Sequence, residues 1–268
     1  GNWLHGHHSG NAGVACYISW QTEASLGGQS VSTVSDDGAW LAFCGQNGGG
    51  GYFRANGVTV ANSTTGTGNE RLCVNTGVTG EVSEWAAAEI ITWDYALSLE
   101  EIEDVEAHFA GRYYSAPTPA PTITPLPSVS PKPTLAYAHP YAHYTYESWN
   151  ATSGIWYDTS GNGFHSNAAT GTVSAVSAVT PGELSYLSGG TSDSICLSDS
   201  DIIASTFTIC SLTRYTSASS RSRIIQGRDG NWLHGHHSGN AGVACYISWQ
   251  TEASLGGQSV STVSDDGA

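Results

Sequence analysis

The chain contains the same 39-residue segment twice. Residues 1–39 and 230–268 are identical at every position, and the offset between them is 229 residues. Repetition at a fixed period is the signature of a repeat architecture, in which each unit is one structural module. We therefore expect a natural unit of 229 residues, with both termini lying as cuts within a longer repetitive chain. A fragment duplicated when the sequence was assembled is the alternative.

Composition limits the class of protein. Charged residues make up 12% of the chain, the net charge is −15, and Lys132 is the sole lysine. This acidity argues against nucleic acids and anionic membranes as partners, because both select for Lys and Arg. The hydrophobic fraction of 39% suffices for a folded core. No apolar run approaches the roughly 20 residues that span a bilayer.

Cysteine usage indicates an oxidising compartment. Each unit holds five different cysteines, since Cys245 is the repeated copy of Cys16. None has the CxxC spacing of a zinc site, which favours disulfides. An odd number leaves one thiol per unit free or bonded to a neighbour. The pairing stays open among Cys16, Cys44, Cys73, Cys196, Cys210 and Cys245.

A proline-rich stretch, residues 115–143, holds eight of the nine prolines. Successive prolines fix φ and remove backbone donors, which predicts an extended polyproline II spacer, on the order of 50 Å long over residues 117–133. Its Ala-Pro, Thr-Pro and Ser-Pro steps resemble the hydroxyproline-glycosylation motifs of plant and algal wall proteins, and the interleaved hydroxyls are typical of an O-glycosylated stalk. A bare flexible linker is the alternative. The candidate glycosylation positions are Pro117, Thr118, Pro119, Pro121, Thr122, Thr124, Pro125, Pro127, Ser128, Ser130, Pro131, Pro133 and Thr134.

The linker divides the sequence into three parts. We expect residues 1–114 to be the C-terminal part of one sandwich repeat and residues 144–268 the N-terminal part of the next. The folded unit then has about 200 residues, which is a normal length for one large β domain. Such a unit closes either with an adjacent copy, or within the chain by residues 40–114 packing onto residues 144–268.

Hydrophobic periodicity predicts a mostly β fold. Residues 207–215 alternate, so that Cys210 and Leu212 face the opposite side from Phe207 and Ile209. Further strands are predicted at residues 13–20, 40–44 and 84–93, separated by Gly- and Asn-rich breaks such as residues 46–51 and 160–163.

One short helix is predicted near the end of the unit. Ser98 and Glu101 form a capping box, and Ile102, Val105 and Phe109 make an apolar stripe. Many short strands with one terminal helix indicate an all-β, two-sheet jelly-roll sandwich.

Two segments carry a family resemblance. Residues 149–165 (WNATSGIWYDTSGNGFH) resemble the opening of concanavalin A-like, laminin G-type lectin domains, where a tryptophan precedes an Asp-x-Ser-Gly-x-Gly turn. Residues 80–114 resemble the end of that family, with a last strand, a short helix and a closing aromatic residue. The middle, with NWLHGHHSG and the turn at residues 54–57, is similar to members in algal and other microbial surface proteins. The resemblance implies a lectin-like sandwich used for carbohydrate binding, adhesion or architecture.

Candidate catalytic carboxylates do not form a recognisable set. The glycosidases of this fold class carry an E-x-D-x-x-E strand, whereas the corresponding stretch here, EWAAAEIITWD, lacks the middle acid. We therefore expect no enzyme activity. The acidic side chains in question, expected at the surface or at strand ends, are Glu81, Glu84, Glu89 and Asp94.

Metal binding is considered at two places. His5, His7 and His8, with their copies His234, His236 and His237, lack a completing ligand set, so we expect a polar surface there. No cofactor is expected, and calcium at a loop rim is the alternative. Its candidate ligands are Asp158 and the pair Asp36 and Asp37, with the copies Asp265 and Asp266; capping of its own Ser-Gly turn is the other interpretation of Asp158.

Two sequons, at Asn62 and Asn150, lie beside predicted turns and are candidate N-glycosylation sites. Trp85, Trp93 and Tyr113 are either core residues or platforms for sugar rings.

These features together predict an extracellular, secreted or cell-surface structural protein. We expect a subunit of a glycosylated fibril or appendage, whose partners are its own neighbouring repeats, covalent glycans and extracellular polysaccharide. A multivalent carbohydrate-binding adhesin or lectin is the alternative.

Overall fold

The computed structural model describes most of the chain from Trp40 to Tyr246 and four short parts outside that range. The described residues are 4–8, 11–16, 40–62, 64, 66–76, 80–113, 139–179, 183–230, 232–237, 240–246, 259–260 and 263–264. The strand predicted at residues 13–20 lies only partly within these ranges.

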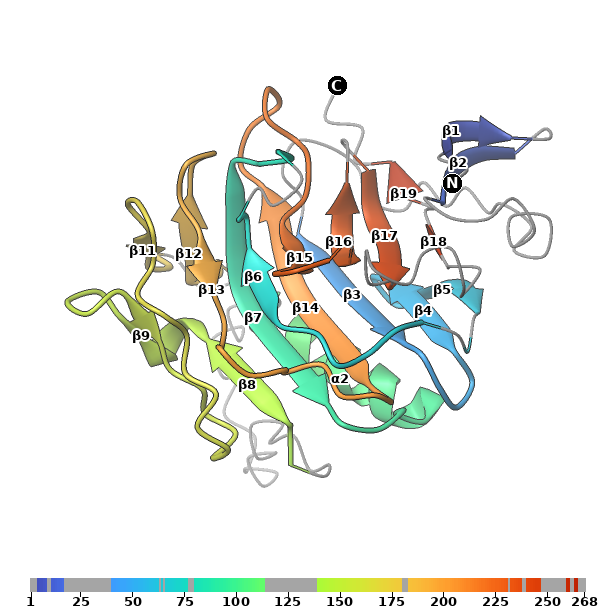
Figure 1. Ribbon diagram of the computed structural model, residues 1–268, viewed down its shortest axis with the longest axis horizontal. Helices are drawn as coiled ribbons and strands as arrows, with labels where there is room; N and C mark the ends of the chain where they lie inside the picture. The colour runs from blue at the N-terminus through green and yellow to red at the C-terminus, as the bar shows by residue number, and fades with distance from the viewer. Residues whose placement is uncertain are drawn as a thin grey trace, which may run out of the picture.

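The described chain is mostly β, with two large antiparallel sheets (Figure 1). The larger has eight strands, in the order β11 (Ser174–Val176), β12 (Tyr186–Gly189), β7 (Trp85–Trp93), β14 (Thr208–Tyr215), β3 (Leu41–Gln46), β4 (Tyr52–Ala55) and β5 (Val58–Asn62), with β8 (Ala142–Thr145) also paired to β7. The smaller has seven, in the order β13 (Ile195–Cys196), β6 (Leu72–Val74), β15 (Ile225–Gly227), β16 (Trp232–His237), β17 (Asn240–Tyr246) and β18 (Ser259–Val260), with β19 (Val263–Ser264) also paired to β17.

Two hairpins stand apart from these sheets. They are β1 (Leu4–His8) with β2 (Asn11–Cys16), and β9 (Trp149–Asn150) with β10 (Ile155–Trp156). A 3-10 turn, Tyr146–Ser148, precedes β9.

The main core lies between the two large sheets. The predicted alternation along β14 explains one wall of it: Ile209 and Tyr215 face this core, as does Phe207 just before the strand. Trp156 and Trp232 are fully buried in the same cluster. The expected sandwich of antiparallel sheets is therefore confirmed.

The outer face of the eight-stranded sheet is covered by helix α2 (Leu99–Tyr113) (Figure 1). Ile102, Val105 and Phe109 are buried there, as the apolar stripe predicts. The capping box is also confirmed, because the Ser98 amide donates to Glu101 Oε2 at 2.7 Å and the Glu101 amide donates to Ser98 Oγ at 3.2 Å.

An ion pair fixes the helix to the sheet. The Arg54 guanidinium of β4 contacts Glu106 Oε2 through Nε at 3.0 Å and Nη2 at 2.8 Å. Both side chains are 9% exposed, so this is a shielded, charge-assisted contact.

Both sides of the proline-rich stretch build the same sandwich. Central strand β7 pairs with β14 and β8, and β14 also pairs with β3. Strands from before and after residues 115–143 therefore alternate within one sheet. Strand β8 begins at Ala142, inside the range expected for the linker. Among the described residues, no helix has the length and hydropathy needed to cross a membrane.

Candidate assembly site

The C-terminal copy of the repeated segment supplies an internal hairpin of the sandwich. Strand β16 pairs with β15 on one side and with β17 on the other. All six residues of β16 are buried. We call the surface that receives this hairpin the seat; it consists of the edge of β15 and the inner faces of β3, β4 and β14.

Aromatic packing joins the hairpin to the seat. Tyr246 stacks on Trp232 with ring centroids 4.6 Å apart, and on Phe53 of β4 at 5.4 Å. A Cβ atom added at Gly45 of β3 would overlap the Tyr246 hydroxyl, so only glycine allows this close approach. The repeated segment is thus an integral part of the core.

The histidines of the repeated segment are buried, which makes the expected polar surface wrong for this copy. His234, His236 and His237 are 0%, 0% and 1% exposed. The reason is that β16 is enclosed by β15, β17 and the opposite sheet, a tertiary effect that overrides local polarity.

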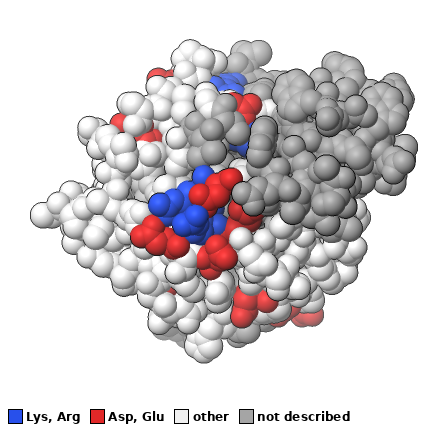
Figure 2. Space-filling view, viewed as in Figure 1, with Lys and Arg blue, Asp and Glu red and all other residues white. Residues whose placement is uncertain are grey.

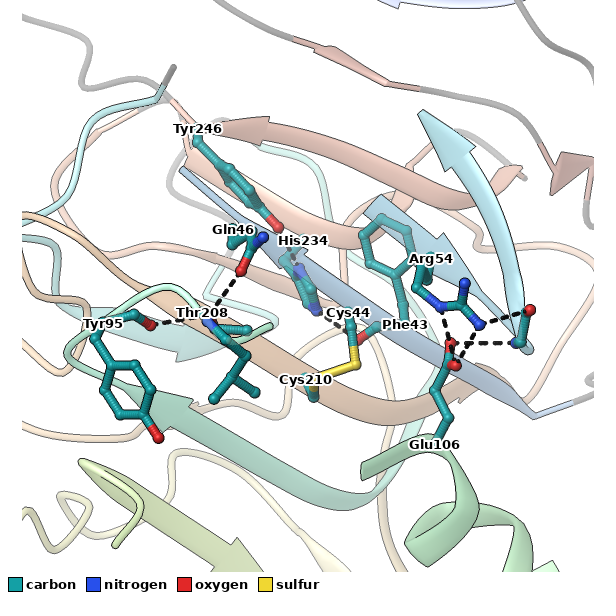
Figure 3. The surroundings of a disulfide bond; sticks show 12 residues. Phe43, Cys44, Gln46, Arg54, Tyr95, Glu106, Thr208, Cys210, His234 and Tyr246 are labelled. Carbon is teal, nitrogen blue, oxygen red and sulfur yellow. Dashed lines mark hydrogen bonds and ion pairs between the residues drawn. A yellow bond between two sulfur atoms is a disulfide. The ribbon is translucent and has the colours of Figure 1, made fainter. Parts of the chain in front are cut away.

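Each of these histidines is held differently (Figure 3 shows His234). His234 Nδ1 lies 2.8 Å from the Tyr246 hydroxyl, and its Nε2 lies 3.2 Å from the Phe43 carbonyl. His236 Nδ1 lies 3.3 Å from Thr213 Oγ1. Burial lowers the pKa of both His234 and His236 to about 3, so both are neutral at neutral pH.

His237 is anchored at the end of β16 by an acidic side chain. Its Nε2 lies 2.9 Å from Glu81 Oε1, and Arg223 Nε lies 2.5 Å from Glu81 Oε2. Glu81 therefore links the hairpin to the chain just before β15.

The N-terminal copy forms the same hairpin outside the two large sheets. In β1 and β2, Leu4 pairs with Cys16 and His8 with Asn11, with a register shift after Gly6. In β16 and β17 the equivalent shift follows Gly235, whose φ is 93°. The sequence of the segment therefore specifies the hairpin and its bulge in both places.

Four cysteines form two disulfides. Cys44 of β3 bonds to Cys210 of β14 on the face under α2 (Figure 3), and Cys73 of β6 bonds to Cys196 of β13. In both cases the two residues stand directly opposite each other in an antiparallel pair. The fifth cysteine of the unit is Cys16 or its copy Cys245, whose side chains lie outside the described part.

The two sequons lie at the surface. Asn62 is exposed at the end of β5, and Asn150 is exposed at the end of β9. Asn150 Oδ1 accepts the amides of Thr152 and Ser153 at 2.9 and 3.1 Å, which builds a turn with the side chain outward. The proline, serine and threonine positions of residues 117–134 lie outside the described residues.

Asp158 caps its own turn. Its Oδ1 accepts the amides of His143 and Ser160, both at 2.9 Å, and its Oδ2 accepts the Ser160 hydroxyl at 2.7 Å and the Phe164 amide at 3.1 Å. The pKa of Asp158 is lowered because these hydrogen bonds outweigh its burial. Asp36, Asp37, Asp265 and Asp266 lie outside the described residues. Within them, no group of three His, Cys, Asp or Glu side chains has the arrangement of a metal site.

Glu89 is fully buried in the middle of β7, contrary to the expected surface or strand-end carboxylate. His143 Nε2 and His108 Nε2 lie 2.7 and 3.0 Å from its Oε1, and Arg112 Nε lies 3.0 Å from its Oε2. Burial raises the pKa of Glu89, but the hydrogen bonds from the two histidines and the charge of Arg112 outweigh it and lower the pKa to about 2. Glu89 thus ties β7, β8 and α2 together.

The aromatic side chains considered as sugar platforms are core residues where they are described. Trp85 is 0% exposed and Trp93 is 1% exposed. The side chain of Tyr113 lies outside the described part.

An acidic hollow of about 390 Å³ lies beside the strands of the smaller sheet. Glu70 lines it and is only 6% exposed. Burial, together with Asp201 and Asp229, raises the pKa of Glu70 to about 7. Figure 2 shows side chains of both charges gathered in one patch on a largely uncharged face. Arg71 forms an ion pair with Asp229 at the hollow.

A second hollow, of about 420 Å³, is basic and aromatic. Arg214, Arg221, Tyr186 and Tyr215 line it together with serine and threonine side chains. The Arg214 guanidinium lies 4.9 Å from the ring centroids of Tyr186 and Trp40. We call this surface the arginine groove.

Sequence reasoning missed the seat, the acidic hollow and the arginine groove, because all three are assembled from residues distant in sequence. The exact repetition was the one signal that pointed to the seat. Comparisons of the chain with family models, curated proteins and solved structures found no match.

Proposed function

We propose that this chain is a structural subunit of an extracellular, glycosylated fibril or appendage built from tandem lectin-like repeats. The observation that carries the proposal is that a segment repeated at a 229-residue offset is also an internal hairpin of the sandwich. A segment that completes a core and recurs along the sequence indicates a chain of like sandwiches. Identical units present identical surfaces, and contacts between them propagate instead of closing.

The fold supports the lectin-like part of the proposal. Two antiparallel sheets face each other across an aromatic core, and a capped helix follows the long strand β7. These features support a concanavalin A-like or laminin G-type jelly roll, which is proposed here as the finer description of the sandwich.

The extracellular setting is supported by covalent chemistry. Two disulfides cross-link the sandwich, and such bonds persist in oxidising compartments. Asn62 and Asn150 are exposed sequon asparagines, so both are accessible to glycosylation. The proline-rich stretch is proposed as a second glycosylated region.

The test is to secrete a chain of three successive 229-residue units from a eukaryotic host and examine it by electron microscopy and sedimentation. The proposal expects beaded filaments that lengthen with concentration, and glycans on Asn62, Asn150 and the proline-rich stretch by peptide mass spectrometry. Isolated particles at all concentrations, with no glycan, would contradict it.

A multivalent carbohydrate-binding adhesin is the second candidate, and the arginine groove favours it. Guanidinium groups beside aromatic rings in a concave surface suit an acidic sugar. Binding of the three-unit chain to an array of acidic polysaccharides, weakened by Arg221→Ala and accompanied by no self-assembly, would support this candidate over the fibril. Adding and chelating calcium during the same assay tests whether the ion is needed.

A further inference from the structure

In this sandwich, both edges of β15, the strand that receives the hairpin, are already paired. Strand β15 pairs with β6 on one edge and with β16 on the other. Only residues 228–231 connect β15 to β16, so the C-terminal copy is held beside its seat by a very short tether. The N-terminal copy finds no open edge on this β15.

The continuation of the N-terminal copy is anchored in this same sandwich. Leu41 begins β3, which pairs with β14 and β4, and Cys44 is bonded to Cys210. The chain that follows the repeated segment therefore belongs to this sandwich, whereas the hairpin of the N-terminal copy pairs with neither large sheet.

We propose that the repeated segment is the joint between successive sandwiches: its hairpin sits in one sandwich, and its continuation from Trp40 onward enters the next. The hairpin of residues 4–16 in this chain would then occupy the seat of a second copy of the unit. The inference rests on the proposed tandem arrangement and names its interface.

Because the two copies are identical in sequence, either hairpin can occupy a seat of this kind. The side chains that fill the seat, Trp232, His234 and Tyr246, have counterparts Trp3, His5 and Tyr17 at the same spacing. The hairpin register and its bulge are also the same in β1 and β2 as in β16 and β17. Any seat of this kind accepts either copy with the same contacts.

The connector gives the joint a short reach. Residues 17–40 link the N-terminal hairpin to β3, but in the seated copy the equivalents of residues 30–31 and 34–35 are β18 and β19, which pair with β17. A hairpin seated in the same way leaves residues 36–40 to reach β3 of the next sandwich, a span of up to about 17 Å. The joint therefore holds successive sandwiches close together.

The proline-rich stretch then has a different role from an inter-domain spacer. Helix α2 ends at Tyr113, and the chain re-enters the same sheet at β8, which pairs with β7. The stretch therefore leaves and returns to one sandwich. In a filament it would project as a glycosylated loop and would not set the distance between units.

The test uses a chain that runs from residue 40 of one unit through the next unit to the end of the repeated segment that follows, so that each of its two sandwiches has its own hairpin. A protease site is placed at one of two positions. One version carries it in the connector, at residues 36–39 of the second unit, and the other carries it in the proline-rich stretch of the second unit. The uncut chains must share one melting temperature. Products are sized by native mass spectrometry before and after reduction.

The inference expects cleavage in the connector to release two separate sandwiches without reduction. It expects cleavage in the proline-rich stretch to release nothing until the Cys44–Cys210 and Cys73–Cys196 bonds, which both span the cut, are reduced and the nicked sandwich is unfolded. The reverse pattern, in which the proline-rich stretch is the only link between beads, overturns it.

Alkylation of free thiols gives an independent result. In the proposed arrangement Cys44 and Cys210 of both units are protected in the oxidised chain. If each sandwich were completed by the following unit instead, Cys44 of the first unit and Cys210 of the second would be labelled. Filaments with the reverse cleavage pattern would support the fibril proposal and overturn this inference. The expected cleavage pattern without filaments would support this inference and overturn the fibril proposal.

Discussion

The sandwich buries ionisable side chains in two regions and accommodates them by opposite means. Beneath α2, Glu89 keeps its charge because His143, His108 and Arg112 contact its two oxygens. Its pKa is lowered to about 2 despite complete burial. That region resembles a small ionic cluster sealed by a helix.

His234 and His236, two histidines of the hairpin held in the seat, are not compensated by charge in this way. His234 and His236 are as deeply buried as Glu89, yet they lie among aromatic rings and a few hydroxyl and carbonyl groups. Their pKa values are lowered by burial to about 3, so they stay neutral. The comparison teaches that the surrounding charges, and not burial alone, decide which form of a buried group the fold requires.

The largest expected effect is at the ionic cluster. Glu89→Ala leaves His108, His143 and Arg112 without their shared counter-charge and is expected to lower the free energy of unfolding by about 3–5 kcal/mol. Urea unfolding at pH 7 measures it. The matched control is Glu147→Ala, since Glu147 is 65% exposed and lies 3.7 Å from Arg112. Its effect should stay below about 1 kcal/mol, and equal effects of the two variants would show that Glu89 is not the anchor.

As pH falls, the buried histidines of the seated hairpin should lower the free energy of unfolding before the ionic cluster beneath α2 does. The folded pKa values of His234 and His236 lie below the ordinary value of 6.5. Between pH 6.5 and about 3 the unfolded chain binds more protons, so stability falls as pH falls, by about 1.4 kcal/mol per pH unit for each histidine. Glu89 adds a further loss only as pH falls from 4.5 toward 2.

The measurement for the seat is the free energy of unfolding from pH 7.5 to 5. His236→Phe should reduce its slope by the share of one histidine, since the replacement ring does not titrate. His236 is suited to the change because its Nε2 is buried without a hydrogen-bond partner among the described residues. An unchanged slope would mean that this histidine is not neutral in the folded protein.

Glu70 offers a third case, a buried carboxyl with acidic neighbours. Its folded pKa is raised to about 7, so its favourable contribution is complete below 4.5 and is lost as pH rises through 7. Glu70→Gln is expected to stabilise the protein by about 2 kcal/mol at pH 8 and to have no comparable effect at pH 4. Thermal unfolding at both pH values checks this, and a gain that does not depend on pH would rule out ionisation as its cause.

The smallest expected effect concerns the start of α2. Ser98→Ala removes the hydroxyl that accepts the Glu101 amide, at a cost of about 1 kcal/mol. Ser200→Ala, an exposed serine outside any helix, should change stability by less than about 0.5 kcal/mol. Chemical denaturation of the two variants side by side gives the difference in their free energies of unfolding. Equal values would mean that the Ser98 cap does not stabilise the helix.

Local patterns predicted the features that depend on local sequence. The cap at Ser98, the buried stripe of α2 and the two faces of β14 follow from spacing alone. The burial of His234 was not predictable in this way, because it requires β15 and the opposite sheet on either side of a polar strand.

The disulfide pairing and the way in which the sandwich closes could be determined only from the tertiary structure. Cys44 and Cys210 are 166 residues apart, and only the register of β3 on β14 brings them opposite each other. The sequence likewise left two closures open, whereas the described strands close within the chain. The exact repeat was visible from the start, but its place inside the core was not.

The central claim is that the repeated segment is both a core hairpin and the link between like sandwiches. Tracing the main chain through native material by cryo-electron microscopy tests it most directly. The account predicts continuous density from the hairpin at residues 232–246 through residue 268 into a strand equivalent to β3 of another sandwich, with one hairpin in every seat. A discrete particle whose chain ends in solvent beyond the hairpin would contradict it.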